Sequence, residues 1–305
     1  MRTAFFDEIV RTAEADDRVW LLAGDLGFSV LEPFSERWPE RFVNVGVAEQ
    51  NMIGIAAGLA LSGKHPLIYS IANFPVMRCL EQIRNDVCYH RLPVRIVSVG
   101  GGLVYGSLGY SHHGVEDLAI TRAMPNMTVF APADPVEARL IARALSSIPG
   151  PAYIRLSKAG DPVLHKTHPD FAVGRILPLR EGNDVTLLAT GNALALALEA
   201  AAVLERNGLS ASVLSVPTVS PIDVGALRAA AQRTGLLATI EEHGPVGGLH
   251  AAVLEALSPE PVACLRFSLD KTPACVSGSR DYLSAAAGLT VNTIVSVLLG
   301  AIDAK

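Results

Sequence analysis

Short apolar runs rich in β-branched residues alternate with longer segments of helical periodicity in the first half of this chain. The apolar runs cover residues 19–25, 41–47, 65–71, 94–100, 127–133 and 152–157, and the helical segments cover 2–16, 48–62, 74–90 and 134–147. Because the runs are apolar on both faces, they are typical of parallel strands that helices cover on each side. The pattern therefore predicts an α/β fold with a doubly wound sheet.

A second alternation follows a stretch rich in proline, glycine, lysine and histidine, SKAGDPVLHKTHPDFA. Its predicted strands are 184–190, 209–216, 235–242 and 261–267, with helices at 192–207, 222–234 and 246–257 and a helical tail. We therefore expect two domains, each a mostly parallel sheet covered by helices. The predicted bounds are 1–158 for the first domain, 159–174 for a linker and 175–305 for the second domain.

The composition excludes several classes of protein. With 50% hydrophobic and 18% charged residues, the chain can bury a sizeable core. Its 25 basic and 30 acidic residues give a formal charge of −5, and there is no long basic run, so no nucleic-acid partner is expected. The apolar helical stretch 52–62 is too short to cross a membrane, so no membrane association is expected either.

The cysteines and the beginning of the chain predict a cytoplasmic location. The four cysteines, at 79, 88, 264 and 275, form no CxxC pair and have no metal-binding spacing. We interpret them as reduced thiols, mostly packed in the interior. The opening MRTAFFDEIV shows no basic leader followed by an apolar core, so a secretory signal is not expected.

Glu49 is a lone carboxylate in the stretch RFVNVGVAEQNMIGIAAGLALSG, and every neighbour within a helical turn is neutral. The simplest interpretation is a charge at a helix N-terminus, where the helix macrodipole favours it. The alternative is a functional carboxyl whose charge is satisfied by something outside this segment. Gly54 and Gly58 give the same helix a smooth face, against which another helix or subunit can pack closely.

Several segments resemble the transketolase family. GVAEQNMIGIAAGLALSGKHPLIYS, NFPVMRCLEQIRNDVCYHRLPV and SHHGVEDLAITRAMPNMTVFAPADPVEA are similar to its pyrimidine-binding domain. DVTLLATG, VLSVPTVSPID and TIEEHGPVGGL are similar to its C-terminal domain. The resemblance covers nearly the whole chain, and it implies the C-terminal half of a split transketolase that depends on thiamine diphosphate.

The resemblance gives Glu49 a chemical role. The matching glutamate of the family hydrogen-bonds N1′ of the cofactor's aminopyrimidine and stabilises its imino tautomer, whose 4′-nitrogen then removes the proton from the thiazolium carbon. Such a role needs a proton-exchanging carboxylate that is held in a dry place and aimed at one ring nitrogen. Apolar surroundings fit that requirement.

Further cofactor contacts follow from the same resemblance. Phe74 matches the aromatic residue that stacks on the pyrimidine ring, although it could also be an ordinary core phenylalanine. Ile71 stands where the family has an additional aromatic residue. Asp25 matches an aspartate near the thiazolium side of the cofactor, and Ser29 matches a serine that helps to bind the substrate phosphate. A strand that ends in Gly-Asp is also common in ordinary loops.

The diphosphate–metal motif of this family, GDG followed later by Asn, has no convincing counterpart. The nearest match is Gly24-Asp25, but Leu26 replaces the final glycine and Asn44 comes only 19 positions after Asp25. Diphosphate with Mg²⁺ needs a glycine-rich backbone and hard oxygen ligands. We therefore expect the diphosphate and Mg²⁺ to be held by a separately encoded N-terminal subunit, in an α2β2 assembly.

The loop GGGLVYGSLGYSHHGVEDL, residues 100–118, resembles the substrate loop of the family. His112 matches a histidine that reaches the reacting carbons and hydroxyls, and an imidazole can pass protons near neutral pH. Relatives often carry glutamine at the position of His113. A solvated loop pair and a two-histidine metal site are the alternatives for these two residues.

Two departures in this loop concern the substrate. Leu108 stands where the family has an acidic residue that orients a sugar hydroxyl, and Gly100 stands where it has a second histidine. A site without these polar groups cannot hydrogen-bond the corresponding sugar hydroxyl and so does not select for it. We therefore expect a deoxy, branched or otherwise unusual sugar, or a smaller aldehyde, rather than the ordinary pentose phosphates.

Positive charges at the end of the last strand of the first domain suggest a phosphate contact. Lys158 falls near a family arginine that binds substrate phosphate, and Arg155 lies on the same strand end; both could equally be linker charges. Lysine offers a point charge rather than a bidentate fork. In the second domain, Glu241, Glu242 and His243 invite a metal interpretation, but in this family that domain is structural.

Three functions stay open. The first is a transketolase-like subunit that moves a two-carbon ketol unit between sugars or aldehydes. The second is another thiamine reaction on the same scaffold, either that of a deoxyxylulose-phosphate synthase or that of a 2-oxoacid dehydrogenase beta subunit. The third is a non-enzymatic binding module. Retention of Glu49, Phe74 and His112 together argues against the third, because a binding module has no chemical need for them.

Overall fold

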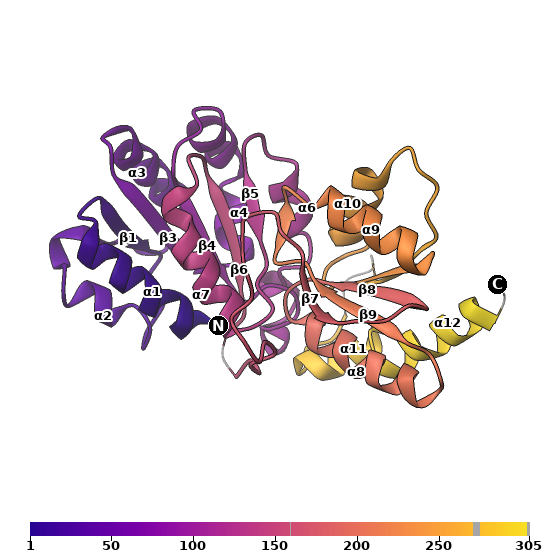
Figure 1. Cartoon of the computed structure of the whole chain (residues 1–305). Helices are drawn as coiled ribbons and strands as arrows, with labels where there is room; N and C mark the ends of the chain where they lie inside the picture. The colour runs from indigo at the N-terminus through magenta and orange to yellow at the C-terminus, as the bar shows by residue number, and fades with distance from the viewer. Residues whose placement is uncertain (159, 271–274, 304–305) are drawn as a thin grey trace.

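The chain folds into two α/β domains that lie side by side (Figure 1). The structure, a computed structural model, describes residues 1–158, 160–270 and 275–303. The first residue predicted for the linker, residue 159, therefore lies outside the described part of the chain. The fold class predicted from the alternation is confirmed, because each domain is built on a mostly parallel sheet flanked by helices.

The first domain forms on a sheet whose strand order is β10-β5-β6-β4-β3-β1-β2. Its own strands are β1 (Val19–Ala23), β2 (Phe42–Asn44), β3 (His65–Ile71), β4 (Arg95–Val99), β5 (Thr128–Phe130) and β6 (Ala152–Leu156). The main helices are α1 (Arg2–Ala15), α2 (Glu32–Ser35), α3 (Glu49–Leu61), α4 (Asn73–Arg78), α5 (Leu80–Gln82), α6 (Asp117–Arg122) and α7 (Pro135–Ala144).

Separate apolar cores cover the two faces of this sheet. On one face α1 and α7 pack over residues such as Leu21, Val97 and Ile154. On the other face α3 packs over Leu22, Ile68 and their neighbours. Successive side chains of a strand point to opposite faces of the sheet. Because helices cover both faces here, the side chains on both faces must be apolar. This explains the uninterrupted apolar runs in the sequence.

The second domain forms on a sheet with the order β12-β11-β8-β9-β7. The strands are β7 (Leu177–Arg180), β8 (Val185–Ala189), β9 (Ala211–Ser215), β11 (Leu237–Ile240) and β12 (Cys264–Phe267). The helices are α8 (Ala193–Arg206), α9 (Val224–Thr234), α10 (Leu249–Leu257), α11 (Arg280–Ala286) and α12 (Val291–Asp303). Helices α9 and α10 cover one face of the sheet, and α8 with α12 covers the other (Figure 1).

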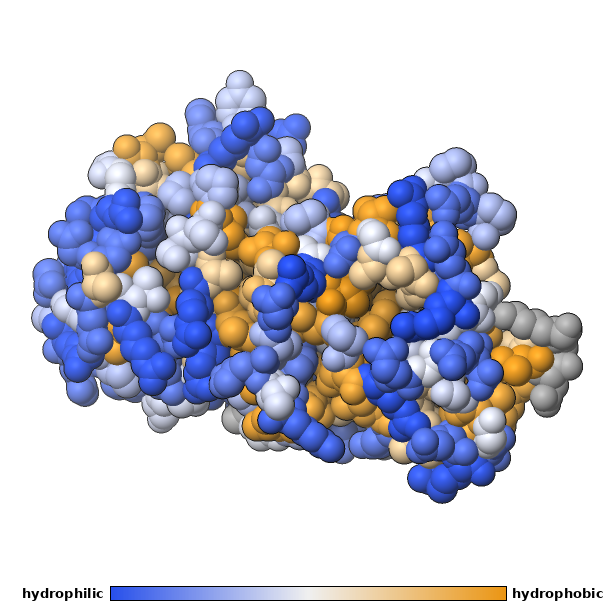
Figure 2. All heavy atoms as spheres, viewed as in Figure 1, coloured by the Kyte–Doolittle hydropathy of each residue, from blue (hydrophilic) through white to orange (hydrophobic). Residues whose placement is uncertain are grey.

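The two domains are joined by more than a linker. Strand β10 (Thr218–Ser220) belongs to the second half of the chain but pairs antiparallel with β5 of the first sheet. The segment between the domains is held at Leu164 and His165, whose backbone N–H groups donate to Asp134 of the first domain. Hydrophobic side chains gather where the domains meet (Figure 2). The linker is therefore a docked segment.

The predicted helix 74–90 is wrong as a single element. It divides into α4, α5 and a π-helix over Ile83–Cys88, and the first break falls at Cys79, whose φ of −113° and ψ of 19° are not helical. Such π-segments are often found at functional sites. The break leaves Arg78 as the last residue of α4.

The sequence singles out 52–62 as its most apolar helical stretch, but Arg280–Ile302 is long and apolar enough to cross a membrane by length and composition alone. The structure divides it into α11 and α12. Leu283, Ile294 and Leu298 of this stretch are buried in the core of the second domain. The residues that it exposes are mostly small or polar. We therefore interpret the stretch as a pair of packing helices.

Candidate active site

The predicted site residues lie along one edge of the first sheet. Asp25 follows β1, Ile71 is the last residue of β3, Gly100 follows β4 and Lys158 comes shortly after β6. These strands are neighbours and parallel, so their carboxyl ends meet at a single edge, which is where open α/β sheets bind ligands.

Glu49 is the first residue of α3, and its side chain is 1% exposed. Arg78 of α4 donates a hydrogen bond from Nη1 to Glu49 Oε2, and the two atoms are 2.6 Å apart. The charge that has no partner in its own segment is therefore satisfied by an arginine 29 residues further on. Burial and the nearby Glu49 charge also raise the pKa of the Cys79 thiol to about 12, which makes that cysteine a poor nucleophile.

An aromatic row continues from this ion pair. The guanidinium carbon of Arg78 lies 4.9 Å from the centroid of the Phe74 ring. The rings of His112 and Phe74 form a T-shaped pair with centroids 5.3 Å apart. The rings of Tyr105 and His112 form a second T-shaped pair with centroids 6.4 Å apart. A cavity of about 290 Å³ lies beside Phe74 and Arg78. Glu49, Phe74 and His112, which are far apart in sequence, are thus brought to one place.

The loop that carries His112 is held in position by neighbouring groups. Asn73 donates from Nδ2 to the carbonyl oxygen of Ser111, 2.9 Å away, and the Ser111 hydroxyl lies 3.0 Å from His112 Nδ1. His113 differs from its neighbour, since it is 2% exposed and its Nε2 lies 3.4 Å from the carbonyl oxygen of Gly106. His113 is therefore a packing residue, and in the described part of the chain no group of three His, Cys, Asp or Glu residues could hold a metal ion.

Asp25 and Ser29 occupy an exposed loop with unusual backbone geometry. Their φ angles are 57° and 65°, in the left-handed region that costs a non-glycine residue of order 1 kcal/mol. Asp25 is bonded in both directions to Asn44: its N–H donates to Asn44 Oδ1, and Asn44 Nδ2 donates to Asp25 Oδ1, each at 3.1 Å. Ile71 is half-buried and packs against the core below the site.

Tyr105 fills the space above Gly100. A Cβ atom at Gly100 would lie 2.1 Å from Tyr105 Cε2, and the φ of Gly100 is +83°. A side chain at position 100 and the Tyr105 ring therefore exclude each other. Leu108, at the other departure from the family pattern, is 53% exposed. Both positions present no polar side chain of their own.

Positive charges lie next to Tyr105. Lys158 Nζ is 5.4 Å from the centroid of the Tyr105 ring, and Arg2 of α1 donates from Nε to the Lys158 carbonyl oxygen, 2.7 Å away. Arg155 does not join them. It is buried, its Nε lies 3.0 Å from Asp117 Oδ2, and it donates to the carbonyl oxygens of Gly114 and Glu242. Arg155 lies on β6 as expected, but its side chain is paired inside the protein, and Arg2 is the second positive charge beside Lys158.

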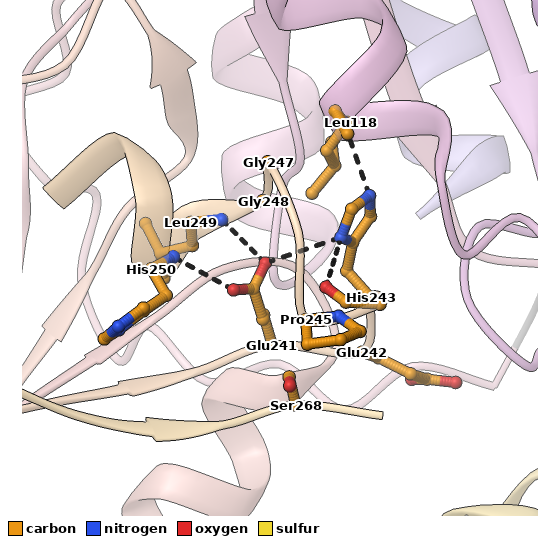
Figure 3. Close-up of polar contacts among 12 residues, drawn as sticks. Leu118, Glu241, Glu242, His243, Pro245, Gly247, Gly248, Leu249, His250 and Ser268 are labelled. Carbon is orange, nitrogen blue, oxygen red and sulfur yellow. Dashed lines mark hydrogen bonds and ion pairs between the residues drawn. The ribbon is translucent and has the colours of Figure 1, made fainter. Parts of the chain in front are cut away.

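The cluster that begins at Glu241 is structural in the described chain (Figure 3). The Glu241 carboxylate accepts the backbone N–H groups of Leu249 and His250, so it caps the beginning of α10. His243 accepts the backbone N–H of Ala119 at Nε2, 3.3 Å away. The cluster thus joins the second domain to the helix that follows the loop of residues 100–118.

Comparisons with known proteins identify the family. The transketolase pyrimidine-binding domain matches residues 1–160, and the transketolase C-terminal domain matches residues 174–294. The chain belongs to the transketolase family. The resemblance seen in the sequence is confirmed, and the family implies the use of thiamine diphosphate.

Three similar proteins carry the comparison further. The chain is 38% identical over 263 residues to an apulose-4-phosphate transketolase subunit of Phocaeicola vulgatus, covering 86% of this chain and 84% of that protein. It is 38% identical over 297 residues to a 6-deoxy-6-sulfo-D-fructose transketolase subunit of a Clostridium species, covering 97% and 92%. A solved structure described as a split gene transketolase, inactive beta4 tetramer, matches with a TM-score of 0.91 at 37% identity, covering 99% and 98%. These relatives are transketolase subunits, and they imply a transferase.

The residues of this site fit one half of the cofactor. A buried carboxylate and an adjacent aromatic face, Glu49 and Phe74, are what a flat ring with a nitrogen to be hydrogen-bonded requires. The same edge of the sheet offers the Asp25–Asn44 pair and nothing richer in oxygen ligands among the described residues. The fit is thus to the aminopyrimidine half.

Sequence reasoning missed Arg78, Arg2 and Tyr105. The sequence shows Arg78 in a helical pattern that continues past it, so nothing marks it as the end of a helix facing Glu49. Arg2 lies at the very beginning of the chain, where α1 brings it to the end of β6. For Tyr105 one signal was available. Gly100 stands where the family has a large residue, a histidine, and the bulky Tyr105 follows five positions later.

Proposed function

We propose that this chain is the C-terminal, beta subunit of a split transketolase-like enzyme that transfers a two-carbon ketol unit from a ketose or ketose phosphate to an aldehyde. The observation that carries the proposal is the convergence of a buried glutamate, an aromatic face and a histidine at the carboxyl edge of the first sheet. The relatives that are named as transketolase subunits support it.

Thiamine diphosphate supplies the nucleophilic carbon and stabilises the negative charge that forms when the donor sugar is cleaved. The chain's own residues prepare that chemistry. Glu49 holds a proton at N1′ of the aminopyrimidine, from a side chain that is itself 1% exposed. Phe74 orients the ring by stacking, and His112 moves a proton at the substrate hydroxyl or carbonyl oxygen.

We infer that a separately encoded N-terminal subunit completes the site. It would supply the glycine-rich backbone and the oxygen ligands for the diphosphate and Mg²⁺, in an α2β2 assembly. Gly54 and Gly58 support an intersubunit role for α3, because a Cβ atom at either position would meet no other atom within 4 Å. The relatives' designation as subunits supports a divided enzyme.

The substrate is expected to differ from ordinary pentose phosphates. Leu108 and Gly100 provide no polar group for the hydroxyls that the family usually recognises, and the Tyr105 ring occupies the space above Gly100. Lys158 and Arg2 place two positive charges nearby, which suits an anionic end group on the sugar. The names of the relatives, with a sugar phosphate and a 6-deoxy-6-sulfo ketose, support a substrate of this class.

Calorimetric titration tests the proposal. Thiamine diphosphate with Mg²⁺ is titrated into the chain alone, and then into the chain mixed with a candidate N-terminal subunit, for wild type and Glu49→Gln. We expect binding only in the mixture, with ketose turnover that Glu49→Gln abolishes. Tight binding to the chain alone would place the diphosphate site on this chain and refute the divided site. Binding in neither case would favour a non-enzymatic module.

A further inference from the structure

Arg78 makes both contacts that the proposed function assigns to the aminopyrimidine. It donates an N–H to the Glu49 carboxylate, with Nη1 and Oε2 2.6 Å apart. Its flat guanidinium lies against Phe74, with the central carbon 4.9 Å from the ring centroid. A nitrogen-rich planar group therefore already joins the carboxylate to the aromatic face.

We propose that the Arg78 side chain occupies the binding position of the aminopyrimidine ring in the cofactor-free chain. The side chain rotates away from Glu49 and Phe74 when the cofactor binds. The inference rests on the proposed function, because it takes Glu49 and Phe74 as the ring's contacts. It adds a residue that neither the family resemblance nor the sequence indicated. Arg78 is a positioning residue in this scheme, since it acts through Glu49.

The electrostatics explain why a placeholder is needed. Glu49 is 1% exposed, and an ionised carboxylate that is buried without a partner destabilises the folded state strongly. While the cofactor is absent, Arg78 satisfies that charge. Removing the arginine leaves the buried Glu49 carboxyl without its partner, which favours the binding of another group that can hydrogen-bond to it.

The chemistry explains why the placeholder must leave. A guanidinium beside a carboxylate favours its ionised form. Activation of the cofactor instead requires Glu49 to share a proton with the ring nitrogen. An arginine that stayed on Glu49 would oppose this step, so the contact seen here and the active arrangement exclude each other.

The local structure allows the movement. Arg78 is the last residue of α4, and its side chain is 45% exposed although it ends on a buried carboxylate. Its backbone is fixed separately, because Gln50 donates from Nε2 to the Arg78 carbonyl oxygen, 3.0 Å away. The side chain can therefore rotate into solvent without unfolding the helix.

Cofactor titration provides the first test. Thiamine diphosphate with Mg²⁺ is titrated into the chain mixed with its N-terminal subunit, for wild type, Arg78→Met and Arg84→Met. Arg84 is an exposed residue of the π-helix Ile83–Cys88, and the side-chain hydrogen bond described for it goes to its neighbour Asn85, so it controls for lost charge. We expect Arg78→Met to lower the dissociation constant about tenfold, the size of one charge-assisted contact, and Arg84→Met to leave it unchanged.

An unchanged or weaker affinity in Arg78→Met would overturn the proposal and make Arg78 a support for Glu49. If Arg78→Met does not fold, Arg78→Lys takes its place. Lysine keeps the charge but lacks the planar fork, so a smaller gain in affinity is expected. Failure of wild type to bind in the mixture would instead contradict the proposed function, so the two failures are distinguishable.

Urea unfolding of the chain alone tests the ion pair without any cofactor. A double-mutant cycle compares wild type, Arg78→Met, Glu49→Gln and the double variant. We expect Arg78→Met to lower the unfolding midpoint and Glu49→Gln to recover much of the loss in the double variant. Additive effects would show that the two side chains do not pair in solution, and the proposal would then fail.

Discussion

Glu242 of the second domain accepts a hydrogen bond from the backbone N–H of Leu103, with Oε1 and N 2.7 Å apart. Leu103 belongs to the loop that carries His112, so this hydrogen bond connects the second domain to that loop. The same carboxylate accepts from Arg280 Nε, 2.8 Å away. The second domain therefore fixes a part of the proposed active site.

Glu242→Ala is expected to lower the free energy of unfolding by about 2–4 kcal/mol, because it removes a buried acceptor and leaves Arg280 without its charge partner. Urea unfolding measures the change. Glu199→Ala, at an exposed position of α8, is the matched control and should stay within about 0.5 kcal/mol of wild type. Equal losses in the two variants would show that the Glu242 contacts contribute nothing to stability.

His112→Asn is expected to reduce kcat of the reconstituted enzyme by about 10²–10⁴, because asparagine cannot pass a proton. Its effect on the affinity for thiamine diphosphate should be small, since the His112 ring contacts Phe74 rather than Glu49. His168→Asn, at an exposed position of the docked segment between the domains, serves as the control for turnover. A full kcat in His112→Asn would remove this residue from the chemistry.

The alternation of apolar runs with helical segments was enough to predict most of both sheets. It missed β7 and β10 for physical reasons: β7 is an edge strand that contains Pro178, and the short β10 pairs with a strand of the other domain, far earlier in the chain. Local pattern carries no information on such pairings.

For the candidate site, the sequence likewise predicted some residues and missed others. Glu49, Phe74 and His112 lie close together through Arg78, whereas their roles remain predictions. The partner of Glu49 could not be found, because the position of Arg78 depends on where α4 stops. Helix α4 ends because Cys79 leaves the helical conformation, and helical periodicity in the sequence does not show that break.

The contact between Gly100 and Tyr105 predicts a strongly non-additive pair. Gly100→Ala should lower the free energy of unfolding by about 2–4 kcal/mol, because the new methyl group meets the Tyr105 ring and the residue keeps a positive φ. In the Tyr105→Ala background the same change should cost only the backbone part, of order 1 kcal/mol. Urea unfolding of the four proteins measures the coupling, and strict additivity would mean that the ring simply moves aside.

A buried cluster at the domain junction makes stability depend on pH. Glu137 and Asp134 of the first domain face His165 of the docked segment, and Ser215 of β9 donates to Glu137 Oε1 at 2.6 Å. Burial raises the pKa of Glu137 to about 7. Burial opposes the charge of His165, but its hydrogen bond to Asp134 and the neighbouring carboxylates outweigh this and raise the pKa of the imidazole.

Both shifts predict that the folded chain loses stability as the pH rises. Between pH 4.5 and 7 the unfolded chain has released the Glu137 proton while the folded chain still holds it, so that contribution is complete below about pH 4.5 and lost by about pH 7. The raised pKa of His165 acts in the same direction above pH 6.5. Glu137→Gln, which mimics the protonated form, should flatten the profile by about 1–3 kcal/mol in urea unfolding from pH 5 to 8. An equal slope in the variant and wild type would place the proton uptake elsewhere.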